Sequence, residues 1–500
     1  MLKVLGSANR LCDSLSRREM LRIGGLTPFA LGLSDLWQMR SLGAKEPAAT
    51  PSFGRAKRVI LLYLYGAAAQ HETFDPKPEA PAEIRGTFQP TETALPGLRI
   101  CEHLPKLATL ADRITFIRSM THPYPVHSAA YTLTGIDKVD IPMELDPYDT
   151  RHWPFFGSVL DYLERKKHPE APPPEVPRNI GLPFLFSSKC AEFDRGGPYG
   201  GFLGRAYNPV WTEFGEKAVR SVPRWRGNRD QQVPDPFLGI SPEARLTVSP
   251  AARLRPELTL DRLNRRRSLL QQLEQSRWAV DQSGMARSLD RFQAMAYSLI
   301  TSRKLREALD IGREPIARRE RYGMTLFGQS VLTGRRLLEA GATMVSVFWD
   351  EFGTANSAWD THFNHDERLK NELLPGLDSA LSALLLDLEQ RGMLDETLVL
   401  CLTEHGRTPK LSSTPRGAGR GHWSGTYCNL FAGGGIARGK VIGRSDKNGA
   451  FVKDNPISPK DVLCTVYHLL GIDHRMYIPD RIGRPTHLVA EGRVVTDMLG

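Results

Sequence analysis

The sequence predicts an α/β fold in which a mainly parallel sheet is flanked by helices. Residues 58–65, 343–348 and 398–402 form short, continuous apolar runs of the kind found in strands that are buried on both faces. Stretches with apolar residues at helical spacing, such as residues 373–391, lie between these runs. This alternation is typical of parallel strands joined by helical crossovers. A chain of 500 residues can form one large domain or two ordinary ones.

The N-terminal segment predicts export. Arg17 and Arg18 precede a weakly apolar run at residues 23–36, a pattern that resembles a twin-arginine signal, with Met20 where Phe is commoner. We therefore expect residues 1–44 to be a signal segment and the protein to be periplasmic or extracellular. A basic surface helix is the alternative interpretation. Residues 45–56 form a Pro/Ala/Ser linker, and no segment is long and apolar enough to predict a membrane span.

The domain after the linker spans residues 57–500. Its first half predicts one strand–helix–strand unit and an insertion. Gly66 ends the first strand, residues 104–111 predict a helix, and residues 114–117 predict the next strand. Residues 137–250 are rich in Pro, Gly, Trp and Arg and show little periodicity, so we expect irregular structure that forms part of a cleft wall. Helices follow, and the irregular and helical insertion covers about residues 137–320. The predicted helices are residues 258–278, 285–309 and 327–340.

The second half predicts the remaining strands and two well-delimited helices. The strand at 343–348 is followed by the helix at 373–391, which ends at Gly392. After the strand at 398–402, Ser458 and Pro459 have the character of an N-cap and a first helical residue. We expect that helix to continue to Gly471.

Composition narrows the classes of ligand. The net charge is +10, which suits an anionic ligand. The basic runs at 265–267 and 318–319 have no interleaved aromatic residues, so no nucleic-acid partner is predicted. The six cysteines form no CxxC pair and predict no disulfide framework. Cys401 and Cys464 lie in apolar segments and are expected in the core.

Acidic and histidine side chains follow each predicted strand. Because parallel strands place their carboxyl ends at one edge of the sheet, these side chains can converge there. A single histidine is more often a hydrogen-bonded structural residue, but a joint pattern of imidazoles and carboxylates suits a divalent cation such as zinc, manganese or calcium. The candidates, in chain order, are His71, Glu72 and Asp75; His122 and His127; Asp360 and His362; and Glu404 and His405, with His422 beyond.

The order of these motifs resembles the alkaline-phosphatase-like superfamily, which includes phosphatases, sulfatases and cofactor-independent phosphoglycerate mutases. More narrowly, the chain resembles the exported domain-of-unknown-function family numbered 1501. The matching stretches include HETFDPKP at 71–78, EHLPKLA at 102–108, WDTH at 359–362, EHGRTP at 404–409 and GHW at 421–423.

The resemblance implies an exported, metal-dependent hydrolase of phosphate or sulfate esters, with carbohydrate esters among the candidate substrates. It implies that Asp360, His362 and His422 hold one ion. Glu404 and His405, with His71, Glu72 or Asp75, would hold or replace a second. His127 would act as nucleophile or general base, Ser128 is the neighbouring nucleophile candidate, and Arg407 would contact the anion.

Two departures from the superfamily pattern support a second hypothesis. Tyr65 and Gly66 stand where the first strand normally ends in a metal-binding Asp, and Pro125 stands at the nucleophile's place. The alternative is therefore a catalytically degenerate protein that has a binding or structural role in the cell envelope.

Overall fold

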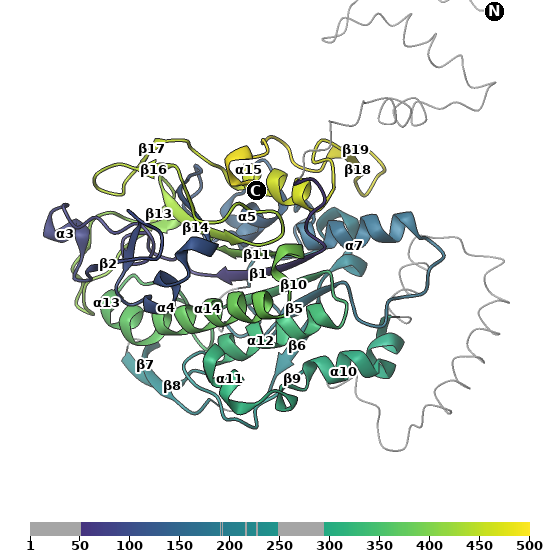
Figure 1. The fold of residues 1–500 in the computed structure, drawn as a ribbon, viewed down its shortest axis with the longest axis horizontal. Coiled ribbons are helices and arrows are strands. Elements are labelled where there is room, and N and C mark those ends of the chain that lie inside the picture. Colours follow the sequence, from purple (N-terminus) through teal and green to yellow (C-terminus); the bar gives the residue numbers. More distant parts are fainter. Residues whose placement is uncertain (1–51, 191, 193, 216–217, 227–228, 249–294) are drawn as a thin grey trace, which may run out of the picture. The chain divides into compact units, whose positions relative to one another are not determined.

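The computed structural model describes residues 52–500 except 191, 193, 216–217, 227–228 and 249–294. The predicted signal segment 1–44, most of the linker 45–56 and the predicted helix 258–278 lie outside the described residues. Residues Ser52–Gly500 form one unit. Its centre is a nine-stranded sheet in the order β15-β4-β14-β11-β1-β10-β5-β6-β9 (Figure 1).

The middle of the sheet is parallel, as predicted. Strand β1 (Arg58–Leu64) pairs in parallel with β10 (Met344–Trp349) on one side and β11 (Thr397–Leu402) on the other. Strand β5 (Asn179–Leu182) continues the parallel set beyond β10, and β6 (Val210–Phe214) continues it beyond β5. The carboxyl ends of β1, β10 and β11 therefore lie side by side at one edge.

The periphery of the sheet is mixed. Strand β14 (Tyr427–Ala432), which the sequence did not predict, runs antiparallel between β11 and β4 (Thr115–Met120). Strand β15 (Lys440–Ile442) pairs in parallel with β4, and β9 (Leu246–Val248) pairs antiparallel with β6. The sheet is mainly parallel, with antiparallel pairs toward its edges.

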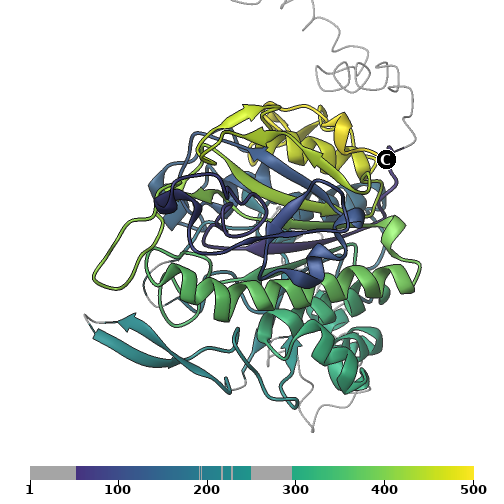
Figure 2. The same ribbon diagram turned by 60° about the vertical axis from the view of Figure 1, so that its left-hand side comes forward.

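Helices cover both faces of the sheet (Figures 1 and 2). One face carries α4 (Pro105–Ala108), α11 (Ile316–Tyr322), α12 (Leu326–Glu339) and α14 (Leu374–Gln390). The other carries α5 (Ala129–Thr134), α7 (Phe156–Lys167) and α15 (Pro459–Leu469).

Strand β1 divides its side chains between the two layers. Ile60 and Leu62 belong to one hydrophobic core, whereas Val59 and Leu61 belong to the other. Because successive side chains of a strand point to opposite faces, a strand buried on both faces needs an unbroken apolar run. That requirement explains why the pattern of β1 was readable from the sequence.

Several predicted boundaries were wrong. The predicted helix at 104–111 ends early, since α4 spans Pro105–Ala108 and is followed by a 3₁₀ turn at Ala111–Arg113. The region 137–250 is not irregular throughout, because it supplies α7, β5, β6 and β9. Strand β5 has only four residues and includes an Asn and a Gly, so it carries no strong apolar signal.

The remaining elements form loops, hairpins and short helices around the sheet. Strands β7 (Ser221–Arg226) and β8 (Arg229–Pro234) form a hairpin outside the main sheet. None of the helices within the described residues has both the length and the apolar character needed to cross a bilayer. The other elements are α3 (Ala82–Arg85), β2 (Pro90–Glu92), β3 (Arg99–Cys101), α6 (Ile141–Leu145), α10 (Arg303–Leu309), α13 (His365–Arg368), β12 (Gly406–Arg407), β13 (His422–Trp423), β16 (Arg444–Ser445), β17 (Val452–Asp454), β18 (Tyr477–Pro479) and β19 (Pro485–His487).

Candidate metal centre

Loops at the carboxyl edge of the sheet bring imidazoles and one carboxylate together. Two groups of potential ligand atoms, each lying within 4.8 Å of one another, share His422. His405 lies three residues beyond the end of β11, and β13, which contains His422, pairs with β12 just after it. The first group is His127, His405 and His422, and the second is Asp360, His362 and His422.

The separations around Asp360 suit a shared cation. Its Oδ1 lies 3.1 Å from the Nε2 of His362, 3.4 Å from that of His127 and 3.5 Å from that of His422. The Nε2 atoms of His362 and His422 are 3.0 Å apart. Ligand bonds of about 2.0–2.1 Å in a tetrahedral zinc site place neighbouring ligand atoms about 3.3 Å apart. The observed separations cluster around that value.

The imidazoles are oriented by hydrogen bonds on their far sides. Nδ1 of His405 donates to the carbonyl oxygen of Gly406 at 2.8 Å, and Nδ1 of His127 donates to Oε1 of Glu404 at 2.8 Å. The Nε2 atom of His405 is buried and has no hydrogen-bond partner, whereas that of His127 forms an ion pair with Asp360. Buried polar atoms without partners are rare and unfavourable, whereas metal-binding histidines commonly use their second nitrogen in this way. The donor set therefore fits a divalent cation.

The protonation states follow from burial and neighbouring charges. Burial favours the neutral form of His127, but Asp360 and Glu404 outweigh it and raise its pKa to about 9. Burial, together with the neighbouring His127 and His422, holds the pKa of His405 well below its usual value, so its imidazole is neutral. The pKa of Asp360 is well below its usual range although burial opposes ionisation, because Arg407 and His127 stabilise the carboxylate. An ionised Asp360 and a neutral His405 are the forms that bind metals.

Glu404, which the resemblance implied as a metal ligand, contacts His127 and the backbone of Gly66. Its Oε1 accepts hydrogen bonds from His127 and, at 2.8 Å, from the backbone N–H of Gly66. The carboxylate therefore orients His127, and it belongs to neither group of converging ligand atoms among the described residues. A carboxylate behind a metal-binding imidazole is a common arrangement that raises the basicity of the ring.

Arg407 and Ser128 also differ from prediction. Arg407 is fully buried and donates to backbone carbonyls and to Asp360, so it faces the protein instead of an external anion. Ser128 is buried and accepts a hydrogen bond from the N–H of Tyr131 as the N-cap of α5. Its hydroxyl oxygen serves as a helix cap, and its role as a nucleophile stays a prediction.

The polar side chains after β1 are placed elsewhere. His71 faces the carbonyl oxygen of Asn448 at 2.8 Å, and Asp75 pairs with Lys77 at 2.9 Å. Glu72 is held by Arg420 and lies 3.0 Å from Nε2 of His365. None of these three predicted ligands joins either group of converging atoms. His122, which also follows a strand end, donates from Nε2 to the carbonyl oxygen of Glu404 at 2.7 Å.

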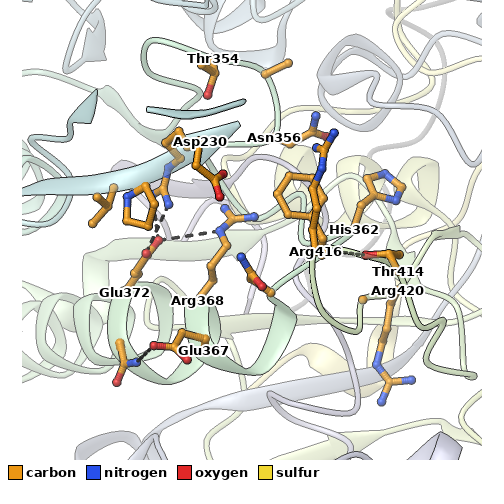
Figure 3. Close-up of a pocket in the computed structure, with 18 of the residues that line it drawn as sticks. Asp230, Thr354, Asn356, His362, Glu367, Arg368, Glu372, Thr414, Arg416 and Arg420 are labelled. Atoms are coloured by element: carbon orange, nitrogen blue, oxygen red, sulfur yellow. Dashed lines mark hydrogen bonds and ion pairs between the residues drawn. The ribbon is translucent and has the colours of Figure 1, made fainter. Parts of the chain in front are cut away.

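A cleft of about 1240 Å³ leads to the centre. The β7–β8 hairpin, the loop after β10 and residues 412–421 line it, and His362 belongs to both the cleft and the metal-ligand group. Arg416 lies 5.0 Å above the ring of Phe363 in the cleft wall. Figure 3 shows His362 beside Arg416 at one end, with Arg368 and Glu372 farther along. Residues between 192 and 238 line this cleft, in agreement with the cleft wall expected from residues 137–250. The contribution of residues 412–421 was not predicted, because loop residues without periodicity carry no signal of which surfaces they form.

The structure resembles several solved hydrolases and a synthase at low similarity. The PsFucS1 sulfatase from Pseudoalteromonas sp. is 12% identical with a TM-score of 0.36, covering 87% of this chain and 70% of that one. The lipoteichoic acid synthase LtaP from Listeria monocytogenes is 11% identical with a TM-score of 0.35, covering 89% and 79%. The phosphonate monoester hydrolase SpPMH from Silicibacter pomeroyi is 12% identical with a TM-score of 0.33, covering 88% and 76%.

No curated protein matches the chain. A sequence model of the family described as "Protein of unknown function (DUF1501)" matches residues 56–499, which is nearly the whole of the described unit. The motifs at the carboxyl edge of the sheet, from His71 to His422, all lie within this match. The chain therefore belongs to the DUF1501 family.

Proposed function

We propose that this protein is an exported, metal-dependent hydrolase of phosphate or sulfate esters. The observation that carries the proposal is the two groups of potential ligands that share His422 beside a large cleft, with the buried Nε2 of His405 left without a hydrogen-bond partner. The export part rests on the arginine pair Arg17 and Arg18 before an apolar run.

The donor set favours zinc or manganese over calcium. Imidazoles form most of the site, and they suit borderline cations, whereas calcium takes six to eight oxygen ligands. Asp360 supplies a single carboxylate among histidines. A bound cation would polarise the ester oxygen and lower the pKa of an attacking water molecule.

Side chains of the protein would supply proton transfer and would orient the substrate. The carboxylate of Glu404 orients His127, and the raised pKa leaves this imidazole protonated near neutral pH, so its Nε2–H beside Asp360 can donate a proton. With Ser128 used as a helix cap, we assign water as the nucleophile. The cleft would orient the rest of the substrate, and its mixed polar lining with the Phe363–Arg416 pair suits the alcohol part of a carbohydrate ester.

A binding role without catalysis is the second candidate. The specific observation in its favour is that none of the converging side chains described here is a hydroxyl or thiol nucleophile, while Gly66 occupies the end of β1. Such a protein would bind the same anionic ligands in the cleft without turnover.

Ester hydrolysis by metal-loaded protein separates the two candidates. The full chain, loaded with Zn²⁺ or Mn²⁺, would be assayed against phosphate and sulfate esters of sugars and phenols. We expect turnover that Asp360→Ala abolishes and that the surface variant His168→Ala retains, since His168 is exposed far outside the ligand groups. Metal and ester binding without turnover would favour the binding role, and absence of bound metal would contradict the proposal.

A further inference from the structure

We propose that the centre is mononuclear: it holds one divalent cation, and the buried guanidinium of Arg407 supplies the second positive charge beside Asp360. This inference rests on the proposed function and deepens it. It concerns how many ions the site takes and which fixed group replaces a second one.

The first step is that the end of β1 has no room for a ligand side chain. Gly66 has φ +104°, and a Cβ added there would lie 2.3 Å from the backbone nitrogen of Asp360 and 2.7 Å from that of Trp359. The N–H of Trp359 donates to the carbonyl oxygen of Tyr65 at 2.9 Å, which fixes the loop after β10 directly on the end of β1. A metal-binding carboxylate at position 66 is therefore sterically excluded.

The second step is that a permanent cation occupies this place. The guanidinium of Arg407 donates from Nη2 to Asp360 Oδ1 and to the carbonyl oxygen of Gly66, and from Nε to that of Ala67 at 3.1 Å. Its Nη1 donates to the carbonyl oxygen of Arg420 at 3.2 Å. An arginine side chain stays charged at all accessible pH values. It neutralises Asp360 at Oδ1, the same oxygen that the imidazoles of His127, His362 and His422 approach.

The two ligand groups are not independent of each other, because they share a histidine. Both groups need His422, and each counts a single atom from it. Asp360 is the single carboxylate in the two groups, so a second divalent cation would be held by imidazoles alone, without a carboxylate to balance its charge. Glu404, which could have completed a second set, is already bound to Gly66 and His127. The two ligand groups are therefore alternative parts of the coordination sphere of one ion.

A single metal site beside the fixed charge of Arg407 would determine how the charge of Asp360 is balanced and which groups bind the ester. Asp360 would hold the cation while it also accepts a hydrogen bond from Arg407, so this one carboxylate would balance both positive charges. Arg407 points at carbonyl oxygens instead of the cleft, which leaves ester binding to the cation and the cleft residues. Activity would then depend on one metal equivalent.

Cobalt titration of the intact, chelator-stripped protein tests the inference without relying on turnover. The visible absorption of bound Co²⁺ reports both the number of equivalents and the coordination geometry. The same titration would be run on His405→Ala and His362→Ala, which remove a ligand from one group each, and on His168→Ala as the surface control.

We expect saturation at a single equivalent for the parent chain and His168→Ala. In a mononuclear centre both ligand variants weaken or reshape the same signal, with affinity losses at least as large as the about 10- to 100-fold typical of outer-shell changes. Saturation at two equivalents, with each ligand variant losing a different one, would overturn this inference and leave the proposed function standing. No cobalt binding at all would overturn both.

Discussion

Buried charges at this site are stable because each has a specific partner. Glu72 is almost fully buried, and Arg420 pairs with its Oε1 while His365 lies beside its Oε2. His365 in turn contacts the hydroxyl of Thr361 at 2.7 Å, next to Asp360. Removing one member of such a set leaves another buried charge unpaired, which is more costly than losing a surface ion pair.

Glu72→Gln should destabilise the protein in a pH-dependent way. Burial opposes ionisation of Glu72, but Arg420 and His365 hold its pKa well below the ordinary value of 4.5. Its contribution is thus present above that value and is lost as the pH falls toward the folded-state pKa. We expect a loss of about 3–5 kcal/mol in unfolding free energy near neutral pH, measured by urea unfolding.

The difference between parent and variant should narrow below about pH 4, since the unfolded chain then binds a proton at Glu72 whereas the folded chain still keeps this carboxylate ionised. Glu389→Gln is the matched control, because Glu389 forms exposed pairs with Arg113 and Arg438 and should contribute below about 1 kcal/mol. An equal loss in both variants would contradict the special role of the buried pair.

At the scale of secondary-structure elements, helix ends and strand ends determine which side chains face the centre. Helix α5 begins at the Ser128 cap, immediately after His127, so the cap fixes the chain where the imidazole leaves it. Helix α15 begins with a capping box of Ser458 and Asp461, as the sequence predicted in part. Both caps satisfy backbone N–H groups that the first helical turn leaves free.

Ser128→Ala should lower stability without abolishing turnover. Loss of an N-cap costs about 1 kcal/mol, and Ser458→Ala, at a cap in another helix, should show a similar loss in chemical unfolding. Turnover, or metal binding if turnover is not found, should persist in Ser128→Ala. Complete loss of hydrolysis with stability unchanged would restore Ser128 as a nucleophile.

Gly66→Ala should be far more damaging than Gly392→Ala. Both glycines have positive φ, +104° and +64°, but an added Cβ meets the Asp360 backbone at position 66 and nothing within 4 Å at position 392. Strain alone costs about 1–3 kcal/mol, and the collision adds the cost of moving two loops. Thermal unfolding of both variants measures the difference, and equal effects would show that the loop after β10 yields easily.

At the scale of the whole molecule, the centre links segments that are distant in the chain, so a bound cation should stabilise the entire domain. A ligand at about 100 times its Kd adds about 2.7 kcal/mol to the unfolding free energy. We expect Zn²⁺ to raise the Tm of the stripped protein by a few degrees. His405→Ala should lose this rise, whereas His168→Ala should keep it.

Much of the architecture was predictable because β1, β10 and β11 are buried on both faces and so consist of unbroken apolar runs. Cys401 and Cys464 are buried, as predicted, and the five cysteines described by the structure are all free. Strands β5 and β14 were missed, since a short strand with Asn and Gly, or one that follows a long loop, gives little local signal.

The site was predictable in residue type and only partly in role. Asp360 and His362 follow β10 and His405 follows the nearby strand β11, which sequence order can indicate, and each of the two ligand groups includes His422. The partners of Glu404 and Arg407 depend instead on loop paths: Gly66 and His127 take the carboxylate, and backbone carbonyls take the guanidinium. Such choices are made by tertiary contacts that no local pattern encodes.

The uneven exposure of the cluster has a kinetic consequence. His362 and His422 keep 38% and 30% of their side chains exposed, while Asp360 and His127 keep 6% each and His405 is fully buried. Ions and chelators must therefore enter and leave past the first two rings, on the side where His362 borders the cleft. A molecule lodged in the cleft would block that exit and lengthen the residence time of the metal, so occupancy of the cleft could be read from the rate at which a chelator strips the ion.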